Sequence, residues 1–222
     1  MSDAQALGLR QICSVLELTL GPAQEQALED YLALLQRWNA TYNLTSVREP
    51  GAMRVLHLAD CLAVVRPLAR MQATAGMPCT LLDVGSGGGL PGVVVAVMLP
   101  TWRVLCVDAV GKKAAFVRQV SGALKLGNLA AEHARVEDLV GAHPPGFGVV
   151  AARAFSSLAD LVALTRPALH PQGVWMAMKG QPPDDELRAL PPDIEAFHVE
   201  PLAVPGLAAQ RCLVWMRPRR DS

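Results

Sequence analysis

The chain has 222 residues, of which 51% are hydrophobic, and its 20 basic and 20 acidic side chains cancel. This length suffices for one sizeable domain with an extension, and the apolar content indicates a packed core. The balanced charge excludes a protein-wide field that attracts nucleic acid, so any contact with nucleic acid must come from a local patch.

The cysteine pattern and the chain start bear on the compartment. Five cysteines, at positions 13, 61, 79, 106 and 212, form no C-x-x-C pair. We therefore expect reduced thiols in a cytoplasmic protein, with neither a disulfide framework nor a metal centre. The first residues do not resemble a signal peptide, and no apolar run approaches the roughly 20 residues of a membrane span.

The first 75 residues have helical periodicity. One apolar face contains Leu9, Ile12, Cys13 and Leu16, and the next contains Leu28, Tyr31, Leu35 and Trp38 in a helix that Pro22 begins. A third predicted helix carries Val55, Leu58, Leu62 and Val65 and ends before Pro67. The polar segment 39–46 is interpreted as a loop. We expect residues 1–75 to form a helical N-terminal extension of a main domain, 76–222, in one compact unit.

Strands and helices alternate from Cys79 onward. Predicted strands cover 81–84, 104–108, 130–134, 148–152 and 173–178, with Trp102 and Trp175 assigned to strands and to the core. Predicted helices cover 91–99, the segment around Phe116, Val120 and Leu124, and 156–169. Two last strand-like runs, 197–204 and 211–216, are joined by a connection too short for a parallel crossover. The sequence therefore predicts an α/β fold with a mostly parallel sheet and a terminal antiparallel hairpin.

A glycine-rich loop follows the first predicted strand, with the sequence Asp83-Val84-Gly85-Ser86-Gly87-Gly88-Gly89-Leu90-Pro91-Gly92. Such a loop brings backbone N–H groups close to a nucleotide-type ligand. Two registers compete, because Gly87-x-Gly89-x-x-Gly92 matches the dinucleotide pattern as a string. In a dinucleotide fold, however, the first glycine directly follows the strand, and counting from Gly85 puts Leu90 where the third glycine belongs.

Two carboxylates help to choose the cofactor. Asp83, just before Gly85, would attract the sulfonium and ammonium of S-adenosylmethionine and repel a pyrophosphate. Asp108 ends the next predicted strand, where a carboxylate accepts ribose hydroxyls of either cofactor. The pattern favours S-adenosylmethionine, a nucleoside held by Asp83, Gly85, Gly87, Gly89 and Asp108, while NAD and a purely structural turn remain alternatives. The terminal hairpin also suits a Rossmann-like class I methyltransferase better than an NAD domain.

The chain resembles the bacterial small-subunit ribosomal RNA guanine-N7 methyltransferases, also called the glucose-inhibited division protein B family. The resemblance covers nearly the whole chain. The matching segments are Trp38-Asn39 with Tyr42-Asn43-Leu44-Thr45, His57 and Asp60, the loop 83–92, Asp108 with Gly111-Lys112-Lys113, Arg153-Ala154-Phe155, and Met178-Lys179-Gly180. Many methyltransferases share the glycine loop, whereas the Tyr-Asn-Leu-Thr segment and the Arg-Ala-Phe turn are more specific. Cys61 departs from the pattern, since the family more often has serine there.

The resemblance implies a class I methyltransferase that uses S-adenosyl-L-methionine, releases S-adenosyl-L-homocysteine and methylates N7 of the guanine numbered 527 in 16S rRNA. It also implies cofactor contacts at Gly85, Leu90, Val136, Glu137 and Arg153. The expected partner is 16S rRNA or a small ribosomal subunit particle, with the protein a monomer. Alternatives are a small-molecule methyltransferase on the same core and an NAD-dependent oxidoreductase.

Chemistry and charge give the remaining expectations. Guanine N7 has a free lone pair and no proton, so no general base is needed and no catalytic residue is assigned beyond an electrostatic role for Asp83. The candidate RNA contacts are Lys112, Lys113, Arg118 and Lys179 for phosphates, and Tyr42 and Phe155 for base stacking. His57 and Asp60, three residues apart on a helix, are interpreted as a packing pair rather than metal ligands.

Overall fold

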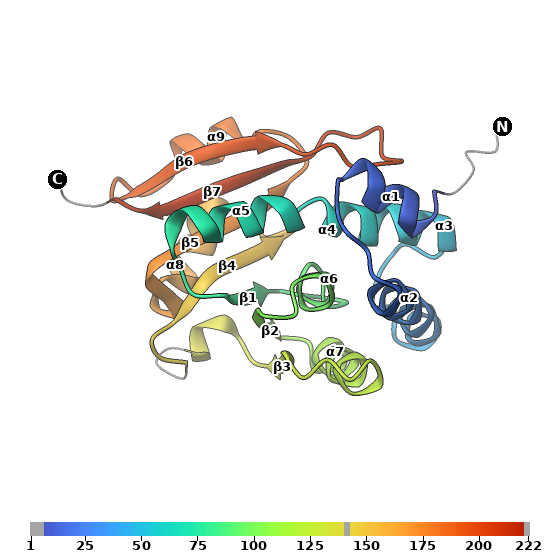
Figure 1. The fold of residues 1–222 in the computed structure, drawn as a ribbon. Coiled ribbons are helices and arrows are strands. Elements are labelled where there is room, and N and C mark those ends of the chain that lie inside the picture. Colours follow the sequence, from blue (N-terminus) through green and yellow to red (C-terminus); the bar gives the residue numbers. More distant parts are fainter. Residues whose placement is uncertain (1–6, 140–142, 220–222) are drawn as a thin grey trace.

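A seven-stranded sheet forms the centre of the computed structural model, which describes residues 7–139 and 143–219 (Figure 1). The strands are β1 (Thr80–Val84), β2 (Arg103–Asp108), β3 (Leu129–His133), β4 (Phe147–Arg153), β5 (Leu169–Lys179), β6 (Ile194–Pro201) and β7 (Cys212–Pro218). Their order is β3-β2-β1-β4-β5-β7-β6. The first five are parallel, and β7 runs antiparallel to both β5 and β6. The predicted mostly parallel sheet with a terminal antiparallel hairpin is confirmed.

Both faces of the sheet are covered, so the central strands are continuous apolar runs. In β1, Leu81 belongs to the core on one face, whereas Leu82 and Val84 belong to the core on the other. Trp215 and Val214 divide in the same way along β7. Successive side chains of a strand point to opposite faces, and this alternation creates two separate cores around one sheet.

Helices are divided between the two faces. On one lie α1 (Leu9–Val15), α2 (Pro22–Tyr42), α5 (Val65–Ala75), α6 (Gly92–Met98) and α7 (Gly111–Ala123), and on the other lie the short η2 (Val136–Leu139), α8 (Leu158–Thr165), η3 (Arg166–Ala168) and α9 (Asp184–Arg188). None of the described helices is long and apolar enough to cross a membrane.

The N-terminal extension shares a core with the main domain. Leu28 and Leu35 of α2 are fully buried in the cluster that also contains Val93 of α6 and Phe116 of α7. Tyr31, on the same face of α2, is fully buried and its hydroxyl donates a hydrogen bond to the carbonyl oxygen of Gly88 at 2.8 Å. Helix α2 therefore packs directly against the glycine loop.

The third predicted helix differs from the structure. The chain forms α3 (Pro50–Met53), a π-helical segment η1 (Arg54–Ala59) and α4 (Asp60–Leu62), and a separate helix, α5, begins at Val65. Pro67 lies in the first turn of α5 rather than after a helix end. The prediction was wrong because proline is tolerated in a first turn, where its missing N–H has no intrahelical acceptor anyway.

Smaller differences from the predicted boundaries occur at β5, α8 and β2. Strand β5 begins at Leu169, four residues before its predicted start, and α8 ends at Thr165 because a short 3-10 turn with Pro167 follows. Trp102 lies just before β2 rather than within it. Trp102 and Trp175 are both buried, as predicted for core residues.

The contact between Tyr31 and Gly88 gives a first prediction. Burial raises the pKa of Tyr31 well above its usual value, so its hydroxyl remains a donor at neutral pH. We expect Tyr31→Phe to lower the free energy of unfolding by about 0.5–1.5 kcal/mol, because the hydrogen bond to Gly88 is lost. The same change should weaken the binding of S-adenosylmethionine, the expected cofactor, because the loop is then held less firmly. Urea unfolding and calorimetric titration measure the two effects. Tyr42→Phe, at the chain's other tyrosine and on the surface, is the control and should change neither.

Candidate cofactor and acceptor site

A cavity of about 570 Å³ opens at the carboxyl ends of β1, β4 and β5. Open α/β sheets bind ligands at this edge. The glycine loop forms one wall, residues 44–47 and η1 form another, and Arg153, Lys179 and Arg211 complete the lining. Gly85, Gly87 and Leu90, which the sequence associated with a cofactor, all line this cavity. The site is therefore shared between the main domain and the N-terminal extension.

Most backbone N–H groups of the glycine loop are already hydrogen-bonded within the protein. Six of its N–H groups donate to acceptors within the protein, namely those of Gly85, Ser86, Gly87, Gly89, Leu90 and Gly92. A pyrophosphate is normally held by unpaired N–H groups at such a loop and helix start. The loop therefore presents bare backbone surface rather than a cradle of N–H donors, which disfavours the dinucleotide interpretation.

Asp83 lies beneath the loop and does not line the cavity. Its side chain is fully buried, and its Oδ2 accepts a hydrogen bond from the N–H of Gly92 at 2.8 Å. A Cβ at Gly92 would come within 2.9 Å of that oxygen and 2.4 Å of Cys106 Sγ, so only glycine allows α6 to start this close to β1 and β2. Burial raises the pKa of the Asp83 carboxyl to about 7. Any electrostatic effect on a ligand must act through the loop.

Asp108 borders the opposite flank of the loop, at the end of β2. Its Oδ2 accepts from Gly87 N–H at 2.9 Å and its Oδ1 from Val110 N–H at 2.8 Å, with Lys113 Nζ 3.7 Å from Oδ2. A carboxylate has about four acceptor sites, so ribose hydroxyls can still bind there. Asp108 does not line the cavity. Val136 and Glu137, which lie in η2 after β3, do not line it either.

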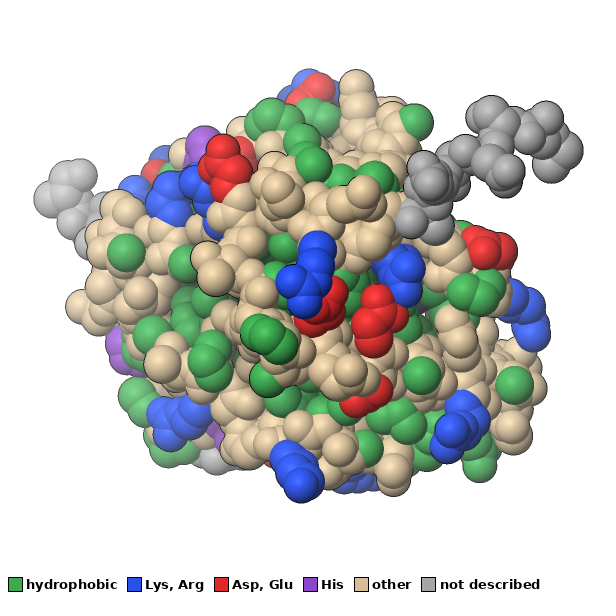
Figure 2. All heavy atoms as spheres, turned by 45° about the vertical axis from the view of Figure 1, so that its right-hand side comes forward, with side chains coloured by type: hydrophobic (Ala, Val, Ile, Leu, Met, Phe, Trp, Pro, Cys, Tyr) green, Lys and Arg blue, Asp and Glu red, His purple; other side chains and the backbone are tan. Residues whose placement is uncertain are grey.

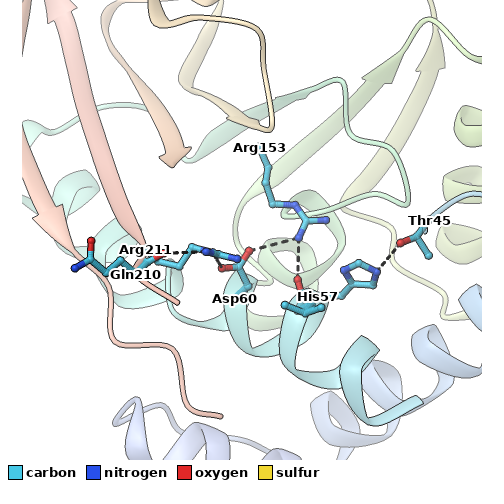
Figure 3. A network of polar contacts seen from close by, with 7 residues as sticks. Thr45, His57, Asp60, Arg153, Gln210 and Arg211 are labelled. Atoms are coloured by element: carbon cyan, nitrogen blue, oxygen red, sulfur yellow. Dashed lines mark hydrogen bonds and ion pairs between the residues drawn. The ribbon is translucent and has the colours of Figure 1, made fainter. Parts of the chain in front are cut away.

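A buried carboxylate joins two arginines in the cavity wall (Figure 3). Asp60 is 3% exposed, and its Oδ2 lies 3.4 Å from Arg153 Nη1 while its Oδ1 accepts from Arg211 Nε at 3.0 Å. Arg153 comes from the end of β4 and Arg211 from the residue before β7. The interaction thus connects the extension with two distant parts of the main domain.

The π-helical segment supplies a further contact to this network. A π-helix shifts backbone hydrogen bonds from their α-helical partners, and such segments are frequent at functional sites. Here the carbonyl oxygen of Leu56 accepts a hydrogen bond from Arg153 Nη1 at 3.0 Å. The neighbouring His57 is buried with its Nε2 3.0 Å from Thr45 Oγ1, and burial, together with the charge of Arg153, lowers the pKa of His57. His57 is therefore neutral at pH 7.

The cation expected to bind phosphate at the end of β5 is already paired. Lys179 lines the cavity, and its Nζ donates to both carboxylate oxygens of Glu186 at 2.8 and 2.9 Å. Lys112, Lys113 and Arg118 lie along α7, outside the lining, where Arg118 donates to the carbonyl oxygen of Ala131. None of these three side chains lines the cavity.

The two expected stacking aromatics also lie outside the cavity lining. Tyr42, at the end of α2, is 44% exposed and its ring centroid is 5.1 Å from that of Trp38. Phe155 is half-buried against the core beneath α8. Tyr42 is available to a base from outside, whereas Phe155 presents only part of its ring.

Arg211 is the site residue that the sequence did not single out. It stands only at the start of a strand-like run in the chain, but the antiparallel pairing of Lys179 with Cys212 brings it to the carboxyl edge of the parallel strands. The predicted hairpin contained this signal, because an antiparallel last strand must begin where its parallel neighbour ends. Within the described ranges, no group of three or more His, Cys, Asp or Glu side chains is arranged to hold a metal ion.

The strand order and a glycine loop without a phosphate cradle define a class I methyltransferase. The family model described as rRNA small subunit methyltransferase G, GidB, matches residues 24–214. A relative of that name from Leptothrix cholodnii is 56% identical over 219 residues, covering 99% of this chain and 94% of its own length. Another from Methylibium petroleiphilum is 56% identical, with 96% of each chain covered. The chain belongs to this family.

Solved structures support the fold. TrmN from Thermus thermophilus aligns with a TM-score of 0.53 at 20% identity, covering 71% of this chain and 48% of that one. The 1,6-didemethyltoxoflavin-N1-methyltransferase of Burkholderia thailandensis aligns with a TM-score of 0.54 at 16% identity, covering 91% and 92% of the two chains. At these identities the likeness concerns the fold alone. Family membership, in contrast, supports the RNA methyltransferase interpretation over the small-molecule and NAD alternatives.

The raised pKa of Asp83 gives a pH-dependent prediction. The unfolded carboxyl has a pKa of about 3.9, so between that value and about 7 the folded protein binds the proton that the unfolded chain has lost. Asp83 therefore stabilises the fold most below pH 4 and progressively less towards pH 7, by up to about 1.4 kcal/mol per pH unit. Asp83→Asn should remove this slope from the urea unfolding free energy measured between pH 5 and 8.

The matched control is Asp30→Asn, at an exposed position of α2. Its unfolding free energy should follow the wild-type pH dependence. Parallel curves for Asp83→Asn and the wild type would show that the buried carboxyl is ionised throughout this range.

Proposed function

We propose that this protein transfers a methyl group from S-adenosyl-L-methionine to N7 of the guanine numbered 527 in 16S rRNA. The observation that carries the proposal is that the glycine loop, Arg153 and Arg211 line the same cavity. The glycine loop suits the nucleoside portion of the donor, and Arg153 is the further cofactor contact that the family resemblance implies. Arg211 suits the anionic backbone of RNA. Family membership supports small-subunit rRNA as the substrate, since the relatives are named as methyltransferases of that RNA, and the resemblance implies the particular guanine.

The loop fits the proposed donor. Gly85 and Gly87 have φ values of +65° and +59°, and a Cβ at Gly85 would meet no atom within 4 Å. The backbone at Gly85 is thus open to the cavity, where a ligand can approach closely. Asp108 lies beside Gly87 at the strand end, in the position to accept ribose hydroxyls. Val136 and Glu137, on the same side of the loop, are proposed to border the adenine.

The chemistry requires alignment rather than proton transfer. The donor supplies an electrophilic methyl on a sulfonium, so the C–S bond breaks as the N7–C bond forms, and the positive charge passes to the base. Because N7 carries no proton, the protein need only hold donor and base in line, which provides about 7–11 kcal/mol of the barrier.

The contact with RNA is proposed to be local. On the side that carries α1 and α2, acidic and basic side chains are interspersed without a continuous field of either sign (Figure 2). Arg153, Arg211 and Lys179 instead gather at the cavity. Tyr42, exposed at the end of α2, is proposed to stack on a base nearby, while Lys112, Lys113 and Arg118 are proposed as phosphate contacts on α7. Such a protein acts in the cytoplasm, on 16S rRNA or on a small-subunit particle.

The direct test is a comparison of 16S rRNA from a strain with the gene and from one without it. Mass spectrometry of the fragment containing guanine 527 should show loss of one N7 methyl group in the deletion strain. Complementation with this chain should restore it. An unchanged methylation level after deletion would reject the proposed acceptor.

A substitution in the loop tests the donor site. We expect Gly85→Asp to abolish S-adenosylmethionine binding in calorimetric titration, because the new side chain would project into the cavity and carry strain from a positive φ. The matched control is Gly76→Asp, since Gly76 at the end of α5 has a φ of +63° and equally open space but lies outside the cavity lining. The control should bind the donor as the wild type does. Equal donor binding by both variants would place the donor elsewhere.

A further inference from the structure

The two arginines that share Asp60 have hydrogen-bonding capacity that the described residues do not use. Arg153 donates through Nη1, and Arg211 donates through Nε to Asp60 and through Nη1 to the carbonyl oxygen of Gln210. Among residues 7–139 and 143–219, neither Arg153 Nε, Arg153 Nη2 nor Arg211 Nη2 has an acceptor. Both side chains are about a quarter exposed, at 25% and 24%, and both line the cavity.

The charge of the lining favours an anion. Arg153, Arg211 and Lys179 are the cations of the lining, and Asp60 is the carboxylate among the lining residues; one net positive charge remains when Glu186 is counted against Lys179. His57 is neutral, and Glu186 pairs with Lys179 from outside the lining. The wall therefore has a net positive charge in a chain whose total charge is zero. Guanidinium groups bind carboxylates and phosphates through fixed, planar pairs of N–H donors.

We propose that Asp60 is a positioning residue that holds Arg211 as a site for one phosphodiester of the RNA beside the target guanine, while Arg153, on the other oxygen of the same carboxylate, is left to the cofactor contact that the family resemblance implies. The inference rests on the proposed function and specifies how its substrate is held. The carboxylate of the methyl donor could accept the same guanidinium hydrogen bonds as a phosphodiester. The phosphodiester is favoured for Arg211 because of the strand order. Asp108, proposed to bind the donor's ribose, ends β2, whereas Arg211 directly precedes β7, and β1, β4 and β5 lie between these two strands.

The shared carboxylate explains how two cations remain close together. Asp60 sits between the guanidiniums and approaches them with different oxygens, at 3.4 Å and 3.0 Å (Figure 3). Arg153 has a second fixed point in the carbonyl oxygen of Leu56, whereas Arg211 is otherwise held by its neighbour Gln210. Loss of Asp60 should therefore release Arg211 more than Arg153.

Arg211→Gln tests whether this group contacts a phosphate. Binding to unmethylated 16S rRNA is measured as a function of salt concentration, together with the KM for unmethylated small-subunit particles. Removing one phosphate contact should lower the magnitude of the log–log salt slope by about 0.7 to 1 and raise KM roughly tenfold. The affinity for S-adenosylmethionine should stay within about twofold. Arg211→Lys, which keeps the charge but loses the planar donors, should fall between these values.

Asp60→Asn separates positioning from charge, because the two predict opposite signs. The substitution adds one net positive charge, so if charge alone mattered, RNA binding would strengthen. If Asp60 acts by holding Arg211, binding should weaken several-fold, and the double variant with Arg211→Gln should be no weaker than Arg211→Gln alone. Thermal unfolding confirms that each variant is folded.

The controls are Asp185→Asn and Arg188→Gln, which make the same charge changes in an exposed ion pair on α9. They should leave the salt slope, KM and donor affinity unchanged. The phosphodiester site would be overturned if Arg211→Gln bound RNA with the same salt slope as the wild type. It would also be overturned if this variant changed only the affinity for S-adenosylmethionine. Either result with an active wild type leaves the proposed function standing, whereas a wild type that does not methylate 16S rRNA would reject the proposed function itself.

Discussion

The hydrogen bond from Gly92 N–H to the buried carboxyl of Asp83 fixes the start of α6 against the end of β1. Two further contacts hold the loop between them, since Asp108 accepts from Gly87 N–H and Tyr31 donates to the carbonyl oxygen of Gly88. These three contacts come from β1, β2 and α2. The shape of the loop is therefore determined by the protein before any ligand binds, which reduces the ordering cost of binding.

The cavity depends equally on residues from outside the parallel sheet. Segment 44–47 and the π-helical η1 form a wall that faces the glycine loop, and Asp60 ties that wall to Arg153 and Arg211. The extension is thus a component of the site as well as a cover for one face of the sheet.

The sequence contained enough information for the fold because strong, repeated signals specify it. Apolar runs ending in Gly85 and Asp108 marked the parallel strands, and the short connection after β6 required an antiparallel end. The helix containing His57 was less predictable, because no residue type signals a π-helix and a first-turn Pro67 resembles a helix terminator. Gly85, expected from the loop itself, and Leu90 and Arg153, implied by the family resemblance, all line the cavity.

Other side chains could not be oriented from the sequence. Asp83 was expected at the mouth of the loop, but the missing Cβ of Gly92 lets α6 approach so closely that the carboxyl is enclosed. Lys179 was expected to be available to a phosphate, but its partner Glu186 comes from a short helix that the sequence analysis did not predict. Such pairings depend on tertiary neighbours, which spacing along the chain does not specify.

The hydroxyl of Tyr31 has a thermodynamic consequence for an enzyme with two substrates. Helix α2 carries Tyr31 on its buried face and the exposed Tyr42 at its end, so one helix contacts the glycine loop and also presents the side chain proposed to stack on a base. If RNA binding at Tyr42 shifts α2, the Tyr31 contact passes that shift to the glycine loop. Linkage is reciprocal. If bound RNA changes the affinity for S-adenosylmethionine by some factor, bound S-adenosylmethionine must change the affinity for RNA by the same factor.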